Sequence, residues 1–396
     1  MPRNLWLLII GMAINVTGAS FLWPLNTIFI HDHLGKSLTV AGIVLMLNSA
    51  ASVIGNLMGG FLFDKIGGYR SILSGIVLTL IALIFMIFFH DWPTYVLLLT
   101  MIGFGQGIVF PAMYAMAGAV WPEGERRAFN AIYVAQNVGV AVGSALGGIV
   151  ASISFEWIFL ANALLYIVFF MISFIGFRHI HVYKGTQTSI LNHSSQIQSK
   201  QKFMALVTVS FGYLLAWVAY SQWASTFSAH SQKVGITLNE YSLLWTVNGT
   251  LIVLGQPLLS SFVKRFAKTL KIQMIIGFSI FILSFMVIAK ATAFTGFLMA
   301  MIILTIGEMF VWPAVPTIAN KLAPKGREGF YQGFVNSTAT GGRMLGPLIG
   351  GLIVDLYGIH LLFVIVIALL CIGLVTTIIY DRKIQTYKDQ KVTFQS

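Results

Sequence analysis

Long apolar stretches constrain this chain more than any other feature. A membrane-spanning helix needs roughly 20 mostly apolar residues, and windows of that length recur twelve times in the sequence. Only 9% of the residues are charged, whereas a soluble domain averages about 25%. We therefore predict an all-α protein that spans a lipid bilayer. The expected spans are 4–30, 40–63, 71–89, 93–121, 128–151, 157–177, 203–228, 238–263, 272–290, 296–322, 330–354 and 361–380.

The net charge of +12 would suit a nucleic-acid partner, but the placement of the cations argues against one. When the loops alternate sides and the N-terminus is inside, 20 of the 24 Lys and Arg residues fall on the inner side. Only Lys36, Lys233 and Lys290 fall outside, and Arg343 lies within a helix. This asymmetry follows the positive-inside rule. It predicts a multi-pass protein of the cell membrane with both termini in the cytoplasm.

The chain divides into two similar halves. Residues 178–202 are rich in Ser, Gln and Lys and are interpreted as a cytoplasmic linker, which leaves bundles at 1–177 and 203–381 and a tail at 382–396. Internal repeats of this kind are typical of secondary transporters, whose substrate site lies between the repeats. The matching segments are Phe104-Gly105-Gln106 with Ile306-Gly307-Glu308, Pro111-Ala112 with Pro313-Ala314, and Gly55-Asn56 with Gly255-Gln256.

A charged, glycine-containing loop follows the second expected span. Gly60, Asp64, Lys65, Gly67 and Arg70 fit the pattern G-x-x-x-D-[RK]-x-G-x-[RK]-[RK], with the basic residue before Arg70 replaced by a tyrosine. This loop resembles the signature loop between helices 2 and 3 of the major facilitator superfamily. The resemblance implies twelve transmembrane helices in two pseudo-symmetric six-helix bundles.

The loop has the chemistry of a conformational latch. Glycines allow helices 2 and 11 to approach closely, and Asp64 can pair with a cation or with the positive N-terminal end of a neighbouring helix. These contacts would have to break when the cytoplasmic side opens. The alternative is an ordinary charged turn that only fixes topology.

A glycine pattern recurs in the fifth and eleventh spans. Drug–proton antiporters of the superfamily commonly carry G-x-x-x-G-P-x-x-G-G in helix 5. The chain departs from that pattern in its fifth span, where Ser144 replaces the proline, and has the complete form in its eleventh span. Glycines four residues apart share one helical face and allow close packing, with or without a role in antiport. The residues are Gly139, Gly143, Gly147, Gly148, Gly342, Gly346, Pro347, Gly350 and Gly351.

Two charges lie near the middle of apolar spans, Glu308 in the tenth and Arg343 in the eleventh. Charge at this depth is costly, so such residues usually face a cavity or each other. A buried carboxyl group can take up and release a proton, and the tenth span resembles that of multidrug–proton antiporters, where an acid has this duty. We predict that Glu308 and Arg343 take part in proton coupling. The alternative is a purely structural ion pair between them.

In the superfamily, helices 1, 4, 7 and 10 line the central path, and helices 5 and 8 contribute to it. The polar and aromatic residues expected near mid-depth there suit amphipathic cargo, and aromatic faces can hold cations. Core packing is the competing role for each of them. The predicted substrate-binding residues are Trp23, Gln106, Tyr114, Gln136, Trp217, Tyr220, Asn248 and Trp312.

No motif for ATP, a dinucleotide or a metal is found, so we expect no cofactor, no metal and no enzymatic activity. The resulting interpretation is a monomeric secondary transporter that exports drugs or other amphipathic small molecules in exchange for protons by alternating access. One alternative is a proton-coupled importer or exporter of a small anionic metabolite that binds Arg343. The other is a membrane sensor that transports nothing.

Overall fold

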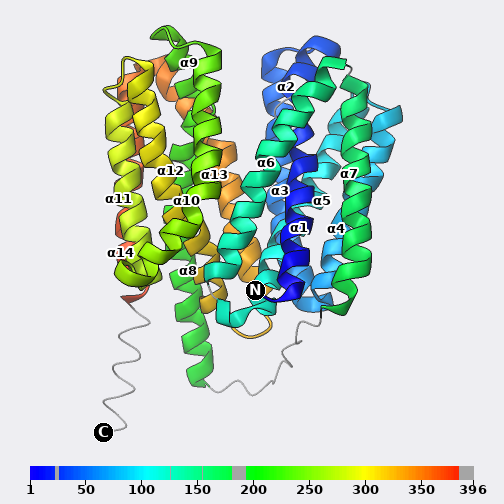
Figure 1. Ribbon diagram of the computed structural model, residues 1–396, viewed down its shortest axis with the longest axis vertical. Coiled ribbons are helices and arrows are strands. Elements are labelled where there is room, and N and C mark those ends of the chain that lie inside the picture. Colours follow the sequence, from blue (N-terminus) through cyan, green and yellow to red (C-terminus); the bar gives the residue numbers. More distant parts are fainter. Residues whose placement is uncertain (23–25, 125, 154, 181–192, 383–396) are drawn as a thin grey trace. The chain divides into compact units, whose positions relative to one another are not determined.

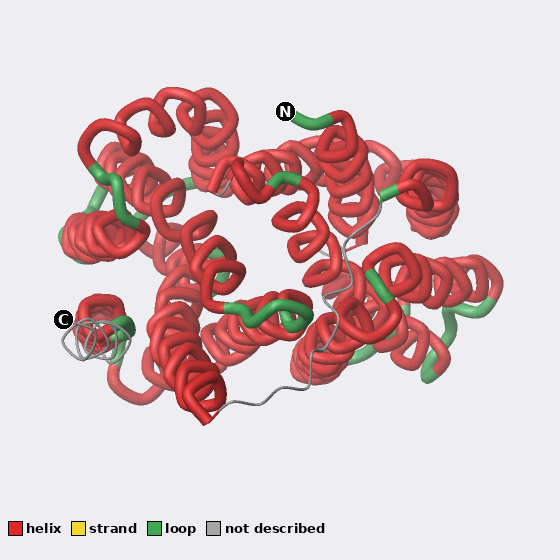
Figure 2. The backbone as a smooth tube through the Cα atoms, turned by 90° about the horizontal axis from the view of Figure 1, so that it is seen from below, coloured by secondary structure: helices red, strands yellow, loops and turns green. Residues whose placement is uncertain are grey.

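Figure 1 shows a computed structural model of the chain. It describes residues 1–396 except 23–25, 125, 154, 181–192 and 383–396. Trp23, residues 181–192 of the predicted linker and nearly all of the predicted tail lie outside the described residues. Seen from below, the described residues form helices joined by short loops, without a strand among them (Figure 2).

The helical elements follow one another with few residues between them. In the first part of the chain they are α1 (Arg3–Leu22), α2 (Asn26–Ile28), the π-helix η1 (Phe29–His33), α3 (Leu38–Ile66), α4 (Gly68–Phe88), α5 (Thr94–Val120), η2 (Pro122–Gly124), α6 (Arg126–Ile153), α7 (Phe155–Gly176) and η3 (Phe177–His179). The remainder comprises α8 (His193–Tyr220), η4 (Ser221–Trp223), α9 (Thr226–Lys233), α10 (Leu238–Phe266), α11 (Leu270–Ile288), α12 (Phe294–Leu322), α13 (Glu328–Tyr357) and α14 (Ile359–Ile379).

Eleven helical segments in the described part of the chain are long and apolar enough to cross a membrane. The predicted span at 330–354 coincides with α13, a 30-residue helix that does not reach this apolar threshold. Its sequence explains the difference, because it carries Glu328, Arg343 and Asp355 together with many hydroxyl and amide side chains. The structure thus supports eleven of the twelve expected spans on composition, and the side of the membrane on which each terminus lies stays a prediction.

The seventh predicted span, 203–228, differs from the observed helix at both ends. α8 begins at His193, inside the predicted linker, and its first turns extend past the lower ends of α10 and α14 in Figure 1. It ends at Tyr220, where the backbone tightens into the 3-10 turn η4. The side-chain amide of Gln222 donates to the carbonyl oxygens of Val218 (2.9 Å) and Gly346 (2.8 Å), which satisfies a carbonyl group near the helix end.

The described chain forms two compact units. Unit 1 comprises Met1–Lys184 together with Arg327–Thr340, and unit 2 comprises Gly185–Gly326 and Gly341–Ser396. The first part of α13 therefore belongs with α1 to α7, because it packs on α3. There Asn56 Nδ2 donates to Thr340 Oγ1 (3.3 Å), and Ser337 Oγ donates to the carbonyl oxygen of Val53 (3.0 Å). The division of the sequence into six helices plus six stays a prediction.

The same helix pairs occur within each unit. In unit 1, α5 packs against α3 and α4, while α7 packs against α1 and α4. In unit 2, α12 packs against α10 and α11, while α14 packs against α8 and α11. The internal repeat in the sequence therefore corresponds to a repeat of helix contacts.

The turns before α3 and α10 repeat as well. Gly35 and Gly235 both have positive φ, +63° and +86°, a conformation that glycine adopts without a steric penalty. Ser37 and Thr237 then cap the two helices, with side-chain oxygens that accept from Val40 N and Glu240 N, both at 3.3 Å. An N-cap hydroxyl satisfies one of the backbone donors that a helix start leaves free. The same local signals therefore start both helices, at Leu38 and at Leu238, which are 200 residues apart in the sequence.

The repeated glycines lie where helices come closest. In unit 1, Gly139 and Gly143 on α6 face α1, and an added Cβ at Gly139 would lie 2.7 Å from the carbonyl oxygen of Ala13. In unit 2, Gly342 and Gly346 on α13 face α8, and a Cβ at Gly346 would lie 2.9 Å from the carbonyl oxygen of Val218. Such glycines allow backbone-to-backbone packing between helices.

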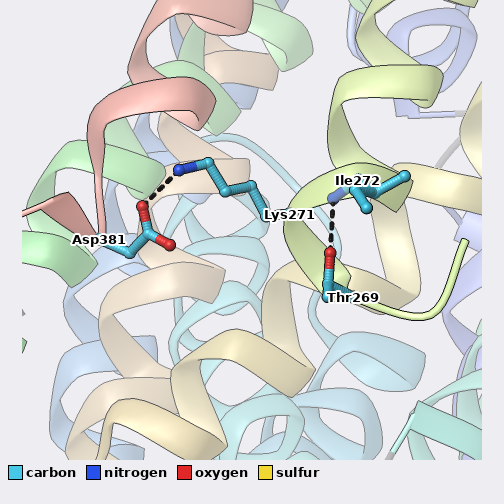
Figure 3. Close-up of polar contacts among 4 residues, drawn as sticks. All are labelled: Thr269, Lys271, Ile272 and Asp381. Atoms are coloured by element: carbon cyan, nitrogen blue, oxygen red, sulfur yellow. Dashed lines mark hydrogen bonds and ion pairs between the residues drawn. The ribbon is translucent and has the colours of Figure 1, made fainter. Parts of the chain in front are cut away.

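At one end of unit 2, an ion pair ties the start of α11 to the residues after α14. Lys271 Nζ lies 2.6 Å from Asp381 Oδ1, and Thr269 caps α11 by accepting from Ile272 N at 3.2 Å (Figure 3). Burial, with the neighbouring Asp381, raises the pKa of Tyr380 to about 12, so this phenol stays neutral. The pair is partly exposed, and such pairs typically contribute about 0–1 kcal/mol.

Two adjacent glycines of α13 give opposite predictions. Gly341 has no neighbouring atom within 4 Å of an added Cβ, whereas a Cβ on Gly342 would lie 2.8 Å from the carbonyl oxygen of Leu214. Gly341→Ala should stabilise the protein by about 0.5–1 kcal/mol because alanine favours helix. Gly342→Ala should destabilise it by about 1–3 kcal/mol through overpacking. Thermal unfolding of the two purified variants in detergent measures both effects, and equal melting temperatures would contradict the close approach of α8 and α13.

Candidate functional site

An aromatic cluster forms the most distinctive part of unit 2. Trp217 of α8 stacks on Trp312 of α12 with ring centroids 4.5 Å apart and planes 6° from parallel. Tyr213 and Tyr220 meet Trp312 edge-on at 5.4 Å and 5.6 Å, and Trp245 of α10 lies 6.2 Å from Tyr220. Offset-stacked and edge-to-face pairs are the favoured arrangements of aromatic rings. Three of the predicted substrate-binding residues, Trp217, Tyr220 and Trp312, are thus brought together.

Glu308 lies beside this cluster and is 2% exposed. Asn248 Nδ2 of α10 lies 2.9 Å from both Glu308 Oε1 and Thr305 Oγ1. Thr305 Oγ1 in turn donates to the carbonyl oxygen of Met301 at 2.7 Å. Because a buried carboxyl group without partners is costly, the amide donor of Asn248, which Thr305 holds in place, helps to explain how α12 accommodates an acid in an apolar segment.

Tyr220 connects the carboxyl group to the aromatic rings. Its hydroxyl group hydrogen-bonds to Glu308, and its ring packs against Trp217 and Trp312. Arg343 of α13 also acts electrostatically on Tyr220. The Arg343 side chain is exposed, and its guanidinium lies over the Trp217 ring, 4.8 Å from the centroid. A cation over a tryptophan face is attracted by the ring's electron density.

Unit 1 contains three other predicted substrate-binding residues. Tyr114 donates from its hydroxyl group to Gln136 Oε1 at 3.2 Å, and its ring stacks on Phe129. Gln106 is partly exposed and hydrogen-bonds to Tyr166 of α7. These residues of unit 1 thus join neutral polar groups, whereas unit 2 concentrates aromatic rings around a carboxyl group.

The predicted latch residues meet the start of α13 within unit 1. Both carboxylate oxygens of Asp64 accept backbone N–H groups at the beginning of that helix, from Gly329 at 2.7 Å and Phe330 at 2.8 Å. An added Cβ on Gly60 would lie 2.8 Å from the carbonyl carbon of Gly329. A carboxylate at a helix N-terminus satisfies free N–H groups and complements the positive end of the helix dipole.

The other residues of the loop serve the turn. Gly67 has φ +90° and joins α3 to α4, with its N–H bonded to the carbonyl oxygen of Phe63 at 3.0 Å. Lys65 Nζ lies over the Phe61 ring at 5.6 Å, and Arg70 is exposed. Of the predicted set, Asp64 bonds to the start of α13 and Gly60 lies close to it.

Some site residues were not anticipated from the sequence. Tyr213 lies four residues before Trp217 and seven before Tyr220, so helical spacing along α8 would have placed it on the same face. Thr305 follows from the same rule, three residues before Glu308. Trp245 carries no such signal, because only the packing of α10 brings it to Tyr220. Among the described residues, no group of three or more His, Cys, Asp or Glu side chains could hold a metal ion.

Comparison with known proteins agrees with this architecture. The sequence profile of the Major Facilitator Superfamily matches residues 8–338 and 210–393. The chain belongs to this superfamily. It is 65% identical over 389 residues to the uncharacterized MFS-type transporter YttB of Bacillus subtilis (strain 168), covering 98% of each chain.

A more distant relative and a solved structure resemble the chain along most of its length. The quinolone resistance protein NorA of Staphylococcus aureus (strain MRSA252) is 25% identical over 365 residues, which cover 90% of this chain and 91% of that protein. A crystal structure of a bacterial homologue of the iron transporter ferroportin superposes with a TM-score of 0.79 at 14% identity. That match covers 96% of this chain and 100% of the other. The likeness to that structure concerns the fold alone.

In this superfamily member, Asp64→Asn should weaken closure of α3 on α13. The substitution keeps the size of the side chain but removes the charge that complements the helix end, worth about 1 kcal/mol or a factor of roughly five in an equilibrium constant. A cysteine introduced as Ser337→Cys, with Cys371→Ser, reports on this contact because Ser337 is 9% exposed and bonded to Val53. Asp64→Asn should accelerate its modification by a maleimide.

The matched control is Glu123→Gln, which neutralises an exposed acid of unit 1. It should leave the modification rate unchanged. An unaltered rate in Asp64→Asn as well would mean that the loop only fixes topology.

Proposed function

We propose that this membrane transporter of the major facilitator superfamily exports amphipathic small molecules in exchange for protons, as a monomer in the cell membrane. The observation that carries the proposal is the buried carboxyl group of Glu308, hydrogen-bonded to Tyr220 at the edge of an aromatic cluster. Aromatic faces suit flat, largely apolar cargo. The similarity to a quinolone resistance protein supports export of such compounds.

Tyr220 provides a physical route from proton to cargo. When Glu308 is ionised, its oxygen accepts the phenol O–H of Tyr220; when Glu308 is protonated, the carboxyl group offers a donor of its own. The protonated group keeps acceptor capacity but is a weaker acceptor than the carboxylate, so its hydrogen bond with Tyr220 weakens or reverses direction. The ring of Tyr220 contacts Trp217 and Trp312 directly. Protonation of Glu308 would thereby alter the surface that receives cargo.

The latch around Asp64 would supply the second part of the cycle. Alternating access requires contacts that form in one state and break in the other. The two hydrogen bonds from Gly329 and Phe330 to Asp64 are suited to this, because their geometry depends on where α13 begins relative to α3. Their loss on opening would leave two N–H groups and a carboxylate to be solvated by water.

Arg343 favours a second candidate function, transport of an anionic compound. Its exposed guanidinium offers a planar set of donors that matches a carboxylate. Stacking on Trp217 fixes its orientation toward such a group. Arg343→Lys keeps the charge but loses the paired N–H donors of the guanidinium. If this variant loses transport of anionic compounds and retains transport of other compounds, the second candidate is favoured.

Reconstituted vesicles test the principal proposal. Glu308→Gln imitates the protonated carboxyl group and keeps its hydrogen-bonding capacity. We expect the variant to bind amphipathic cargo but to lose accumulation driven by an imposed pH gradient. Transport of a panel of compounds against their concentration gradients, with and without the pH gradient, measures this.

Asp355→Asn is the control, because Asp355 is an exposed acid of unit 2. It should accumulate cargo as the unmodified protein does. Full pH-driven accumulation by Glu308→Gln would contradict the role given to Glu308 and leave it as a structural residue.

A further inference from the structure

The interior of unit 1 contains a cluster of neutral polar side chains on three helices. Tyr166 of α7 donates its hydroxyl proton to Asn15 Oδ1 of α1 at 2.7 Å and also hydrogen-bonds to Gln106 of α5. Asn162 lies one turn before Tyr166 on α7. Asn15, Asn162 and Tyr166 are each 0% exposed.

Three polar atoms of this cluster have no hydrogen-bonding partner in the described structure. They are Asn15 Nδ2, Asn162 Nδ2 and Asn162 Oδ1. The Asn162 amide and the Tyr166 ring both lie against Gly18, where an added Cβ would be 2.7 Å from Asn162 Oδ1 and 3.3 Å from the ring. Gly18 is one turn from Asn15 on α1, so the unpartnered atoms are gathered along one short seam between α1 and α7.

Burial without partners would be expensive at this depth. At about 1.5 Å per residue, Asn15 lies about 18 Å along α1 from Arg3, near the middle of a hydrocarbon core about 30 Å thick. Each unpartnered buried group costs about 1–3 kcal/mol. Three such groups would therefore cost several kcal/mol, which is comparable with the whole stability of many proteins.

We infer that the seam at Asn15 and Asn162 binds at least one ordered water molecule. A buried water typically makes about three hydrogen bonds to otherwise unsatisfied groups, and the seam provides two amide NH2 groups and one amide carbonyl oxygen. An ion does not suit it, because these side chains and Tyr166 are all uncharged and a bare charge in such surroundings is heavily penalised. Gln106, which hydrogen-bonds to Tyr166, is partly exposed.

This water is a structural ligand of the helix pair. Asn15 and Tyr166 meet directly, whereas Asn162 reaches its partners only through the water. A bridging water can reorient as the helices shift, so it keeps these groups satisfied over a range of small displacements between α1 and α7.

Hydroxyl-radical labelling in ¹⁸O-enriched water tests the inference on the unmodified protein. Radiolysis converts a water held against a tyrosine into a local oxidant, so Tyr166 should take up ¹⁸O although it is fully buried. Tyr95 is the matched control, since it is also 0% exposed and its hydroxyl group donates to an asparagine, Asn26 Oδ1, at 2.8 Å. We expect labelling of Tyr166 to be several-fold faster than labelling of Tyr95. Equally slow labelling of the two would overturn the inference.

Asn162→Leu gives a second test, because it should change the melting temperature in opposite directions for a hydrated seam and for a dry seam. If the seam holds water, leucine removes its partners and strands Asn15 Nδ2, so the melting temperature falls and labelling of Tyr166 drops to that of Tyr95. If the seam is dry, leucine removes two unpartnered atoms, so the melting temperature rises and labelling is unchanged. Thr79→Val is the control, because Thr79 is buried and its hydroxyl group already bonds to the carbonyl oxygen of Gly75; it should leave labelling of Tyr166 unaltered.

Discussion

The carboxyl group of Glu308 must keep its hydrogen bonds because it is buried in the middle of an apolar 29-residue helix. Asn248 and Tyr220 supply them from α10 and α8, so three helices of unit 2 are tied to one acid. The aromatic stack of Trp217 on Trp312 then fills the space beside it. In the proposed function, the hydrogen-bonded carboxyl group is the one that changes charge, and the neighbouring rings are the surface that receives apolar cargo.

The same constraint takes another form in unit 1. Asp64 is satisfied by two backbone N–H groups at the start of α13, which is a bond to a helix end and not to a side chain. A contact of this kind depends on the position of a whole helix, so it suits a latch. Glycines at the closest approach, Gly60 on α3 and Gly329 on α13, allow the two helices to come near enough for such bonds to form.

Features set by local sequence could be predicted. Apolar length gave most of the helices, and four-residue glycine spacing identified the faces that pack against α1 and α8. The charge pattern after the second span singled out Asp64. Its expected partner was a cation or the N-terminal end of a helix, and the structure has the helix end. These signals lie within one or two helical turns, where spacing alone determines which side chains share a face.

Features set by packing between distant helices could not be predicted. Trp245 reaches Tyr220, and Asn15 reaches Tyr166, only through the way that their helices meet. The end of α8 at Tyr220 was not predicted, because the break is stabilised by a hydrogen bond from Gln222 to Gly346, which lies on another helix, α13. The close approach of α13 to α3 was expected from the glycines of the charged loop, but the inclusion of the polar first half of α13 in unit 1 was not.

The central claim is that Tyr220 transmits the protonation of Glu308 to the aromatic cluster. Binding affinity as a function of pH, for a compound that the unmodified protein transports, tests it in Tyr220→Phe and Tyr213→Phe. Both variants keep an aromatic ring beside Trp312, but only Tyr220→Phe loses the hydroxyl group that bonds to Glu308. The account predicts that Tyr220→Phe binds cargo with an affinity that no longer varies with pH, while Tyr213→Phe retains the pH dependence. An unchanged pH dependence in Tyr220→Phe would contradict it.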